Sequence, residues 1–262
     1  MKKTVLITGA TGGIGRNLAK VFAINGYNLV LTSTNLEKLE TLKNELLTFN
    51  NSLNIDVFVC NLNDSNSSSE IYKFTNNKNY FIDILVNNAG FGNFGDFSKI
   101  PYEKEDELIN VNIKALTQLT YLYLKDMIKN KKGKILNVGS IASFASGPYL
   151  ATYYASKNYV LAFSEALAKE VKQYNINVMC LCPGTTDTGF EKRANLDNSK
   201  LFTTLRVAKP EKVANFAYKK LMKNKEIAIY GISNRILIVL IRFAPRKLVR
   251  YIIFKIQEKR KK

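Results

Sequence analysis

Apolar residues follow two alternating periods along the chain, one typical of buried strands and the other of amphipathic helices. Short β-branched runs are followed by segments whose apolar residues recur every three or four positions, as at Ile14, Leu18 and Phe22. The predicted strands are residues 4–8, 28–32, 55–60, 82–86, 134–138, 176–181 and 227–230. The predicted helices are residues 14–24, 36–47, 104–128, 152–173 and 210–223, with a short one beginning at Ser67.

Strands that alternate with helices form a parallel sheet covered on both faces. The pattern therefore predicts an α/β fold, a doubly wound Rossmann-type parallel sheet of about seven strands in a single domain. We place this domain at residues 1–231 and a C-terminal extension at residues 232–262. Ser67 and Glu70 have the spacing of a capping box, which would open the third helix.

Residues 8–15, Thr-Gly-Ala-Thr-Gly-Gly-Ile-Gly, lie between the first strand and the first helix. Glycines at this place let the backbone turn tightly and approach a pyrophosphate, and the helix N-terminus offers free N–H groups. The spacing differs from the G-x-G-x-x-G fingerprint, and the alternative is an ordinary strand–helix loop. The position at the first crossover favours a dinucleotide site.

The end of the second strand bears on the choice of nicotinamide cofactor. An acid there favours NAD and a basic residue favours NADP, but this chain has Ser33, Thr34 and Asn35. No carboxylate repels a 2′-phosphate, and Arg16 and Lys38 lie on nearby helices. NADP(H) is therefore the preferred cofactor, with NAD(H) as the alternative.

Composition limits the chemistry that the 262 residues can perform. The chain contains no His, so a Ser-His-Asp triad, a Cys-His pair and a His-ligated metal site are all excluded. Its three cysteines, Cys60, Cys180 and Cys182, lack zinc spacing and are too few for a disulfide framework. We expect them to be buried, reduced thiols of a cytoplasmic protein, and we expect no metal.

Tyr153 and Lys157 lie four positions apart on a predicted helix, so they share one face. A cation beside a phenol favours the phenolate and lowers the tyrosine pKa, which would make Tyr153 a general acid or base. The alternative is a surface lysine beside an aromatic ring. Other polar residues point to the same sheet edge: Ser140 after the fifth strand, residues 87–90 after the fourth, and residues 183–188 after the sixth.

Together these motifs resemble the short-chain dehydrogenase/reductase family over residues 1 to about 230. The resemblance implies that Tyr153 is the proton donor, that Lys157 binds the nicotinamide ribose, and that Ser140 binds the substrate oxygen. It also implies that Asn112 supports a water relay. The cofactor contacts that it implies are Gly9, Thr11, Gly13, Ile14, Gly15, Ser33, Thr34, Asn61, Leu62, Asn88, Ala89, Gly90, Tyr153, Lys157, Pro183, Gly184 and Thr188.

The chain departs from the family pattern at Asn61, where an Asp usually contacts adenine. The amide keeps an acceptor and loses the charge. The resemblance also makes residues 186–207 a substrate lid. Its apolar residues, which could instead pack on the body, suggest a hydrophobic substrate: Phe190, Leu196, Leu201, Phe202 and Leu205.

The net charge of +18 is concentrated near the C-terminus. Residues 232–262 contain ten basic residues and one acidic residue, Glu258, and Pro245 divides them into two predicted helices. Basic amphipathic helices suit an anionic membrane surface, and they equally suit packing on the core. No apolar stretch reaches the roughly 20 residues of a membrane span, and we expect no nucleic-acid partner.

These observations predict an NAD(P)-dependent oxidoreductase acting on a carbonyl or alcohol substrate that is small and hydrophobic. The resemblance includes bacterial reductases related to 3-ketoacyl and hydroxysteroid enzymes. The alternatives are a 3-oxoacyl-thioester reductase and a non-catalytic dinucleotide-sensing or membrane-surface protein. We expect a homodimer or homotetramer, because Val160, Phe163 and Leu167 continue the Tyr153 helix, although they could be buried within one subunit.

Overall fold

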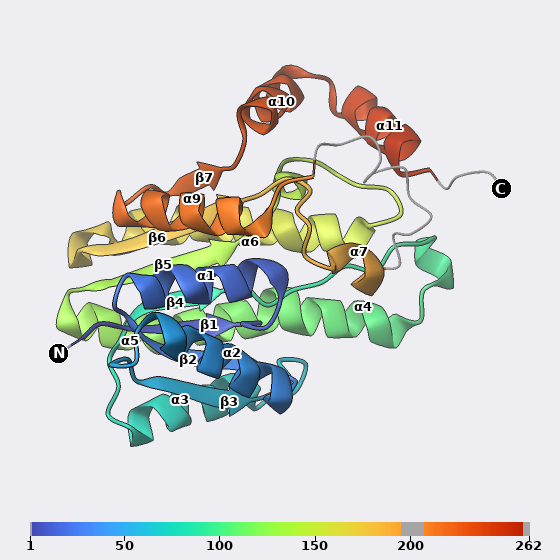
Figure 1. Ribbon diagram of the computed structural model, residues 1–262. Coiled ribbons are helices and arrows are strands. Elements are labelled where there is room, and N and C mark those ends of the chain that lie inside the picture. Colours follow the sequence, from blue (N-terminus) through green and yellow to red (C-terminus); the bar gives the residue numbers. More distant parts are fainter. Residues whose placement is uncertain (1, 195–206, 259–262) are drawn as a thin grey trace.

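The computed structural model describes residues 2–194 and 207–258, which form one sheet of seven parallel strands. The strand order is β3-β2-β1-β4-β5-β6-β7, so the chain winds outward in one direction from β1 and then in the other from β4 (Figure 1). The predicted doubly wound α/β fold is confirmed. The strands are β1 (Thr4–Thr8), β2 (Asn28–Ser33), β3 (Ile55–Val59), β4 (Ile82–Asn87), β5 (Gly133–Val138), β6 (Ile176–Cys182) and β7 (Ile227–Ile229).

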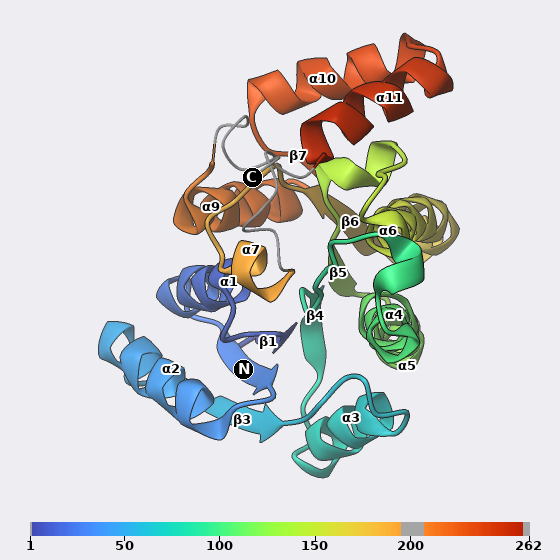
Figure 2. The ribbon, with the colours of Figure 1, turned by 90° about the vertical axis from the view of Figure 1, so that its right-hand side faces the viewer.

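Helices cover both faces of the sheet (Figure 2). The first face carries α1 (Gly13–Ile24), α2 (Leu36–Phe49) and α9 (Pro210–Met222). The second carries α3 (Ser67–Asn77), α4 (Tyr102–Ile109), α5 (Leu116–Asn130) and α6 (Ala151–Val171). The short α7 (Phe190–Arg193) and the helices α10 (Ile232–Phe243) and α11 (Arg246–Gln257) lie outside these two layers.

The strands are apolar on both faces because each face packs on helices. Val5 and Ile7 of β1 contribute to the core under α1 and α9, whereas Leu6, between them, packs on the opposite side. This alternation follows from the two-residue period of a strand. All five residues of β1 are buried, which explains why its sequence reads as a continuous apolar and β-branched run.

Polar side chains tie the buried layers together at one place. Asn87 of β4 donates hydrogen bonds to Thr120 of α5 at 3.0 Å and to Asn137 of β5 at 2.9 Å. Asn137 in turn donates to Ser164 of α6 at 2.9 Å. These bonds pair most of the buried polar groups, and the Asn87 side-chain oxygen alone among them is buried without a partner in the described part of the chain.

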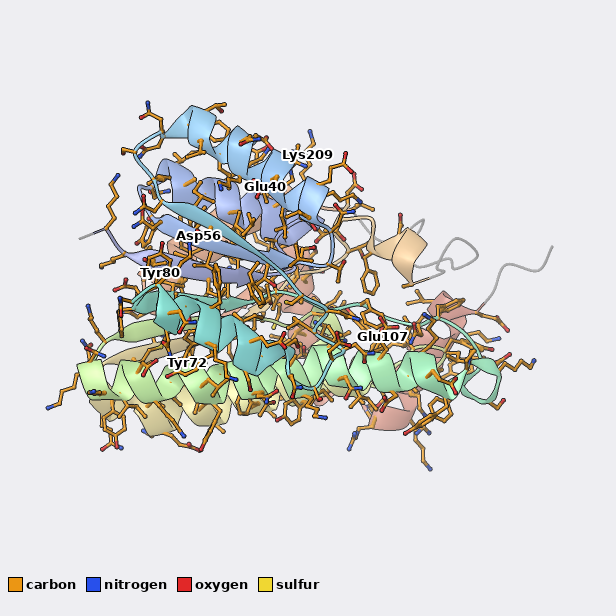
Figure 3. All side chains as sticks on the ribbon, turned by 90° about the horizontal axis from the view of Figure 1, so that it is seen from below. Glu40, Asp56, Tyr72, Tyr80, Glu107 and Lys209 are labelled. Carbon is orange, nitrogen blue, oxygen red and sulfur yellow. The ribbon has the colours of Figure 1, made fainter. Side chains whose placement is uncertain are left out.

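The outer strand β3 is held by charged and phenolic groups (Figure 3). Asp56 accepts hydrogen bonds from Lys78 at 2.6 Å and from Tyr80 at 2.7 Å. The bonds from Lys78 and Tyr80 hold the pKa of the Asp56 carboxyl below its usual value, although its partial burial acts in the opposite direction. The two hydrogen bonds of Asp56 thus connect β3 to the segment that leads into β4.

The structure corrects two local predictions. Ser67 does not cap α3: Asn66 precedes the helix without a side-chain cap, and the Ser67 hydroxyl donates to the carbonyl oxygen of Asp64 instead. The long helix predicted for residues 104–128 is divided by a π-helical turn at Asn110–Ala115. Such a turn inserts one extra residue and reorients the side chains that follow it, a feature that apolar spacing does not reveal.

The ends of β1 and β4 meet where the winding direction reverses, and Thr8 joins them. Its hydroxyl accepts hydrogen bonds from the backbone N–H groups of Asn88 and Ala89, at 3.0 and 3.1 Å. Asn88 returns the interaction, because its side-chain amide donates to the carbonyl oxygens of Thr8 and Gly9 at 2.9 and 3.0 Å.

We therefore expect Thr8→Val to lower the free energy of unfolding by about 1–3 kcal/mol, since it leaves two backbone N–H groups without an acceptor. Thr4→Val is the matched control, because the Thr4 hydroxyl has no hydrogen-bond partner in the described part of the chain and the residue is also buried in β1. Urea unfolding at equilibrium measures both. Equal midpoints for the two variants would contradict this role of Thr8.

Candidate active site

A cavity of about 770 Å³ runs along the carboxyl ends of the strands, next to the point where the winding reverses. Open α/β sheets bind ligands at this place. All the residues predicted from sequence for catalysis or cofactor binding line this cavity except Gly15 and Asn112. Those two lie behind its wall, and the reason differs for each.

The glycine-rich turn is shaped by close backbone contacts. Gly9 has a φ of +61°, and a Cβ added there would lie 3.0 Å from the Cα of Ala89. A Cβ on Gly15 would collide with the carbonyl oxygen of Gly9 and the amide of Asn88, so this glycine lets α1 pack closely behind the turn. α1 begins after Gly12, which has no side chain to occupy the first helical N–H groups. These groups remain available to an anion.

Hydroxyl and amide groups line the far end of the cavity, at β2 and β3. The Thr11 and Ser33 hydroxyls form a hydrogen bond of 2.7 Å that fixes the turn against β2. Asn61 also lines the cavity, and its side-chain oxygen accepts from the backbone N–H of Asn63 at 3.1 Å.

The two basic residues predicted near this end of the cavity, Arg16 and Lys38, differ in their ion pairs. Arg16 forms an ion pair with Glu45 at 2.5 Å, and Lys20 contacts the same carboxylate at 2.6 Å. Lys38, at the start of α2, is exposed, lines the cavity, and forms no ion pair with any described residue.

Ser140, Tyr153 and Lys157 converge on the other end of the cavity. Ser140 follows β5 and caps the 3-10 helix Ile141–Phe144, with its hydroxyl accepting from the N–H of Ala142 at 3.1 Å. Tyr153 and Lys157 are one turn apart on α6, and the Lys157 Nζ lies 5.8 Å from the Tyr153 ring centroid. This Nζ donates to the carbonyl oxygen of Val138 at 2.9 Å.

Asn112 lies in the π-helical turn and is buried. Its side chain accepts from the N–H of Phe91 at 3.1 Å and donates to the carbonyl oxygen of that residue at 2.9 Å. It also donates to the Ser156 hydroxyl at 3.0 Å. Asn112 thereby fixes the segment after β4 to α6. A Cβ on Gly90 would lie 3.0 Å from the Asn112 side chain and 3.3 Å from the Lys157 Nζ.

Burial controls the two titratable groups of the site. It raises the pKa of Tyr153 to about 12, and a hydrogen bond with Ser140 only partly opposes this rise. Burial also lowers the pKa of Lys157 to about 8, which the nearby sulfur atoms of Cys180 and Cys182 oppose. In the chain alone the pKa of Tyr153 thus lies above its ordinary value, because burial disfavours the phenolate, and a lowering of this pKa by Lys157 stays a prediction.

The segment after β6 crosses the middle of the cavity. A Cβ on Gly13 would lie 2.7 Å from Thr188, so this threonine rests directly on the glycine-rich turn. Phe190 of α7 covers Tyr153, with ring centroids 5.2 Å apart. The segment returns at Ala208, whose backbone pairs with Thr185 and Asp187 at 2.9 and 3.0 Å. The lid residues predicted at Leu196, Leu201, Phe202 and Leu205 lie outside the described residues.

Sequence reasoning missed the part of the wall that α10 and α11 contribute. The sequence feature that could have indicated this wall is the helical spacing of Leu237, Leu240, Ile241 and Ala244. The prediction assigned these residues to a tail without a role in the site. It also left out Tyr154, which lines the cavity and accepts a hydrogen bond from Gln257 at 2.7 Å. Val160 and Leu167, proposed as subunit contacts, are instead buried within the chain.

The donor set of this cavity fits a nicotinamide dinucleotide. The glycine-rich turn and the uncapped start of α1 suit the pyrophosphate, and hydroxyl groups surround the adenosine end. Lys157 and Thr188 line the same cavity. Three buried cysteines are free thiols, as predicted.

Comparison with known proteins agrees with this geometry. Residues 3–199 match the short chain dehydrogenase family. The chain is 32% identical over 218 residues to the 3-oxoacyl-(acyl-carrier-protein) reductase FabG of Thermotoga maritima, covering 81% of this chain and 87% of that protein. It is 33% identical over 193 residues to nodulation protein G of Rhizobium meliloti, covering 74% and 77%.

Solved structures share the whole fold. A short-chain dehydrogenase from Sphingobium yanoikuyae in complex with NADPH superposes with a TM-score of 0.82 and 27% identity, over 93% of this chain and 97% of that one. A 7β-hydroxysteroid dehydrogenase superposes with a TM-score of 0.85 and 23% identity over 96% of each chain, which shows the fold alone. The chain therefore belongs to the short-chain dehydrogenase/reductase family and is an NAD(P)-dependent oxidoreductase.

Proposed function

We propose that the chain reduces an apolar ketone or aldehyde with NADPH as the hydride donor. The observation that carries this proposal is that Ser140, Tyr153 and Lys157 line the same cavity as the glycine-rich turn. One continuous space thus offers a dinucleotide site and, at its other end, a proton donor beside a hydrogen-bonding hydroxyl.

In this proposal Tyr153 gives its proton to the substrate oxygen while Ser140 donates a hydrogen bond to the same atom. NADPH, held by the glycine-rich turn and Lys157, would supply the hydride for the carbonyl carbon. The raised pKa keeps Tyr153 protonated near neutral pH, which suits a proton donor in the reductive direction. Lys157 holds the ribose hydroxyls, and Asn112 keeps the surrounding backbone in place through Phe91 and Ser156.

The walls around Tyr153 support an apolar substrate. Phe190 packs on its ring, and Leu150 is buried next to it. The residues that α10, α11 and the turn between them contribute to the cavity wall are all aliphatic: Leu237, Leu240, Ile241, Ala244, Val249, Ile252, Ile253 and Ile256.

A second candidate substrate is a 3-oxoacyl thioester. Its support is the 32% identity to the 3-oxoacyl-(acyl-carrier-protein) reductase of Thermotoga maritima over most of both chains. The same Ser140, Tyr153 and Lys157 would act on its 3-oxo group. The aliphatic wall of α10 and α11 favours the free apolar ketone, since a thioester carrier would have to reach the cavity past these helices.

We further propose that the chain self-associates and that its C-terminal helices contact a membrane surface. Exposed aromatic residues on α4, α5 and α6 support self-association, namely Tyr102, Tyr121 and Tyr159. In the part of the chain that the structure describes, no helix combines the length and low polarity that a bilayer crossing requires. The proposed membrane contact is assigned to α10 and α11 because both helices carry exposed apolar residues, such as Phe243 and Leu248.

We expect Tyr153→Phe to reduce kcat by about 10²–10⁴, since the proton donor is removed, while the Kd for NADPH changes less than about threefold. Tyr154→Phe is the matched control and keeps kcat within about tenfold, because the Tyr154 hydroxyl is bound to Gln257. Turnover is followed as NADPH oxidation with free ketones and with 3-oxoacyl thioesters. Full activity of Tyr153→Phe on both substrate classes would reject the mechanism, and a thioester preference would select the second candidate.

The pKa of Lys157, lowered to about 8, predicts a pH dependence. Lys157 is charged below pH 8 and becomes neutral as the pH rises through this value. Its hydrogen bonds to the cofactor therefore weaken. We expect kcat/KM for NADPH to be level at pH 6–7 and to fall by up to about tenfold per pH unit above 8. Tyr153, with a pKa of about 12, stays protonated throughout. Lys157→Arg keeps its charge and should lose the inflection near pH 8, whereas a wild-type profile level to pH 10 would exclude this assignment.

Lys38 should determine the preference for NADPH. Lys38→Ala is expected to raise the Kd for NADPH by about tenfold, roughly the value of one charge-assisted hydrogen bond at a partly exposed site. The Kd for NADH should change less than twofold. Lys43→Ala on the same helix removes an equal charge outside the cavity and controls for long-range effects. Fluorescence titration with both nucleotides measures this, and parallel losses for the two would remove Lys38 from the 2′-phosphate site.

A further inference from the structure

The helices α10 and α11, residues 232–257, form a roof over the substrate end of the cavity. They follow β7 and stand apart from the layered body (Figure 1 and Figure 2). On α10 the lining residues Leu237, Ile241 and Ala244 follow helical spacing along one side. The inner side of the roof therefore forms part of the cavity wall.

The outer side of the roof is also apolar. Ile232, Ile236, Val239 and Phe243 recur every three or four residues on α10, so they form a stripe facing away from the cavity. Their exposed fractions are 76%, 56%, 55% and 84%. On α11 the exposed apolar residues are Leu248, Tyr251 and Ile252. Contiguous apolar surface of this kind marks a contact site for an apolar partner.

Positive charge surrounds this apolar surface. Six basic residues of the roof are exposed, and the acidic residue nearest to them in sequence is Glu258, which forms an ion pair with Lys255 at 3.6 Å. The partner must therefore present both apolar groups and negative charge. A second copy of the chain would bring two like-charged surfaces together across a two-fold axis, which is unfavourable. An anionic lipid bilayer meets both requirements. The basic residues are Arg235, Arg242, Arg246, Lys247, Arg250 and Lys255.

The cavity is open to solvent beside residues of both roof helices. Leu240 of α10 and Ile252 of α11 line the cavity, and their exposed fractions are 62% and 47%. The opening beside these two residues, one on each helix, is called the mouth.

Polar and aromatic contacts attach the roof at its two ends. At the start of α10, Asn234 donates to the carbonyl oxygen of Tyr230 at 2.7 Å and packs on Gly184. At the end of α11, Gln257 donates to the Tyr154 hydroxyl at 2.7 Å, and Phe254 stacks on Tyr149 with centroids 5.4 Å apart. Between these ends Ile238 of α10 is buried, and α10 contacts the 3-10 helix that follows Ser140.

We propose that the roof lies on an anionic bilayer and that the apolar substrate enters the cavity from the lipid through the mouth beside Leu240 and Ile252. This inference rests on the proposed function for the identity of the substrate. It adds the source of that substrate and the surface through which it arrives. The stripe on α10 inserts between the lipid chains, and the basic residues bind the headgroups.

The first experiment measures binding of the full chain to vesicles of phosphatidylcholine with 30% phosphatidylglycerol. Ile236→Ser/Phe243→Ser removes two side chains of the outer stripe that do not line the cavity, and should weaken binding at least tenfold. Ile24→Ser/Phe97→Ser removes the same side chains from exposed positions elsewhere and should bind like wild type. Unchanged NADPH affinity shows that each variant is folded.

Charge is tested separately. Arg246→Gln/Lys247→Gln/Arg250→Gln should weaken binding by about fivefold per charge. Lys129→Gln/Lys131→Gln/Lys172→Gln removes three exposed charges at the amino ends of β5 and β6, away from the roof, and should bind like wild type. Equal losses for the two sets would mean that net charge alone governs binding, which would overturn the proposed surface.

The absence of tryptophan from the chain allows a direct test of insertion. A tryptophan in place of Phe243 should shift its emission to the blue and be quenched by brominated lipids in anionic vesicles. A tryptophan in place of Phe97 should not. Quenching of neither reporter would overturn membrane contact. Loss of a dimer in the stripe variant, seen by sedimentation velocity without vesicles, would identify a second copy as the occupant and overturn it equally.

The entrance itself is tested by delivering one ketone in two ways. 2-Tridecanone is supplied in the anionic vesicles or from a cyclodextrin complex, and NADPH oxidation is followed. Wild type should be at least fivefold faster with the vesicles, and Ile236→Ser/Phe243→Ser should lose this advantage while keeping its rate with cyclodextrin. Equal rates from both sources in wild type would overturn entrance from the lipid. Absence of turnover from both sources, with vesicle binding intact, would instead count against the proposed function.

Discussion

The hydrogen bonds between the ends of β1 and β4 are the interaction on which the rest of the site depends. A sheet that winds in two directions leaves the helices that follow β1 and β4 on opposite faces, with a gap between them at the carboxyl edge. Thr8 and Asn88 close the floor of this gap through four hydrogen bonds between side chains and backbone. The glycine-rich turn can then remain open above, because the side chain of Asn88 satisfies its carbonyl groups from below.

Much of this arrangement could be predicted from the sequence, because both the fold and the dinucleotide motif are local patterns. The apolar spacing of strands and helices is visible within short segments. Parallel strands necessarily bring their carboxyl ends to one edge of the sheet. The sequence therefore predicts that Ser140 and Tyr153 lie at the same sheet edge as the glycine-rich turn, and the cavity contains all three. The ranges of the strands agree with the structure to within one or two residues.

The remainder could not be predicted, because it depends on tertiary surroundings. The π-helical turn at Asn112 leaves apolar spacing almost unchanged, so a continuous helix was expected. The pKa of Tyr153 depends on how deeply the phenol is buried, which the spacing to Lys157 does not show. The position of α10 and α11 could not be read either, since helices apolar on both sides suit a core, a cavity wall and a membrane surface equally. Only the fold shows that they serve two surfaces at once.

The roof comes after the whole nucleotide-binding sheet in the order of the chain, and this order has a consequence for synthesis and for divergence. Domains fold as the chain emerges from its N-terminus, so β1 to β7 and the cofactor groups can assemble before residues 232–257 exist. Hydride and proton chemistry is thus encoded in one segment, and the surface that admits the substrate in another. Descendants of such a gene can exchange the second segment and acquire new substrates without altering Ser140, Tyr153 or Lys157.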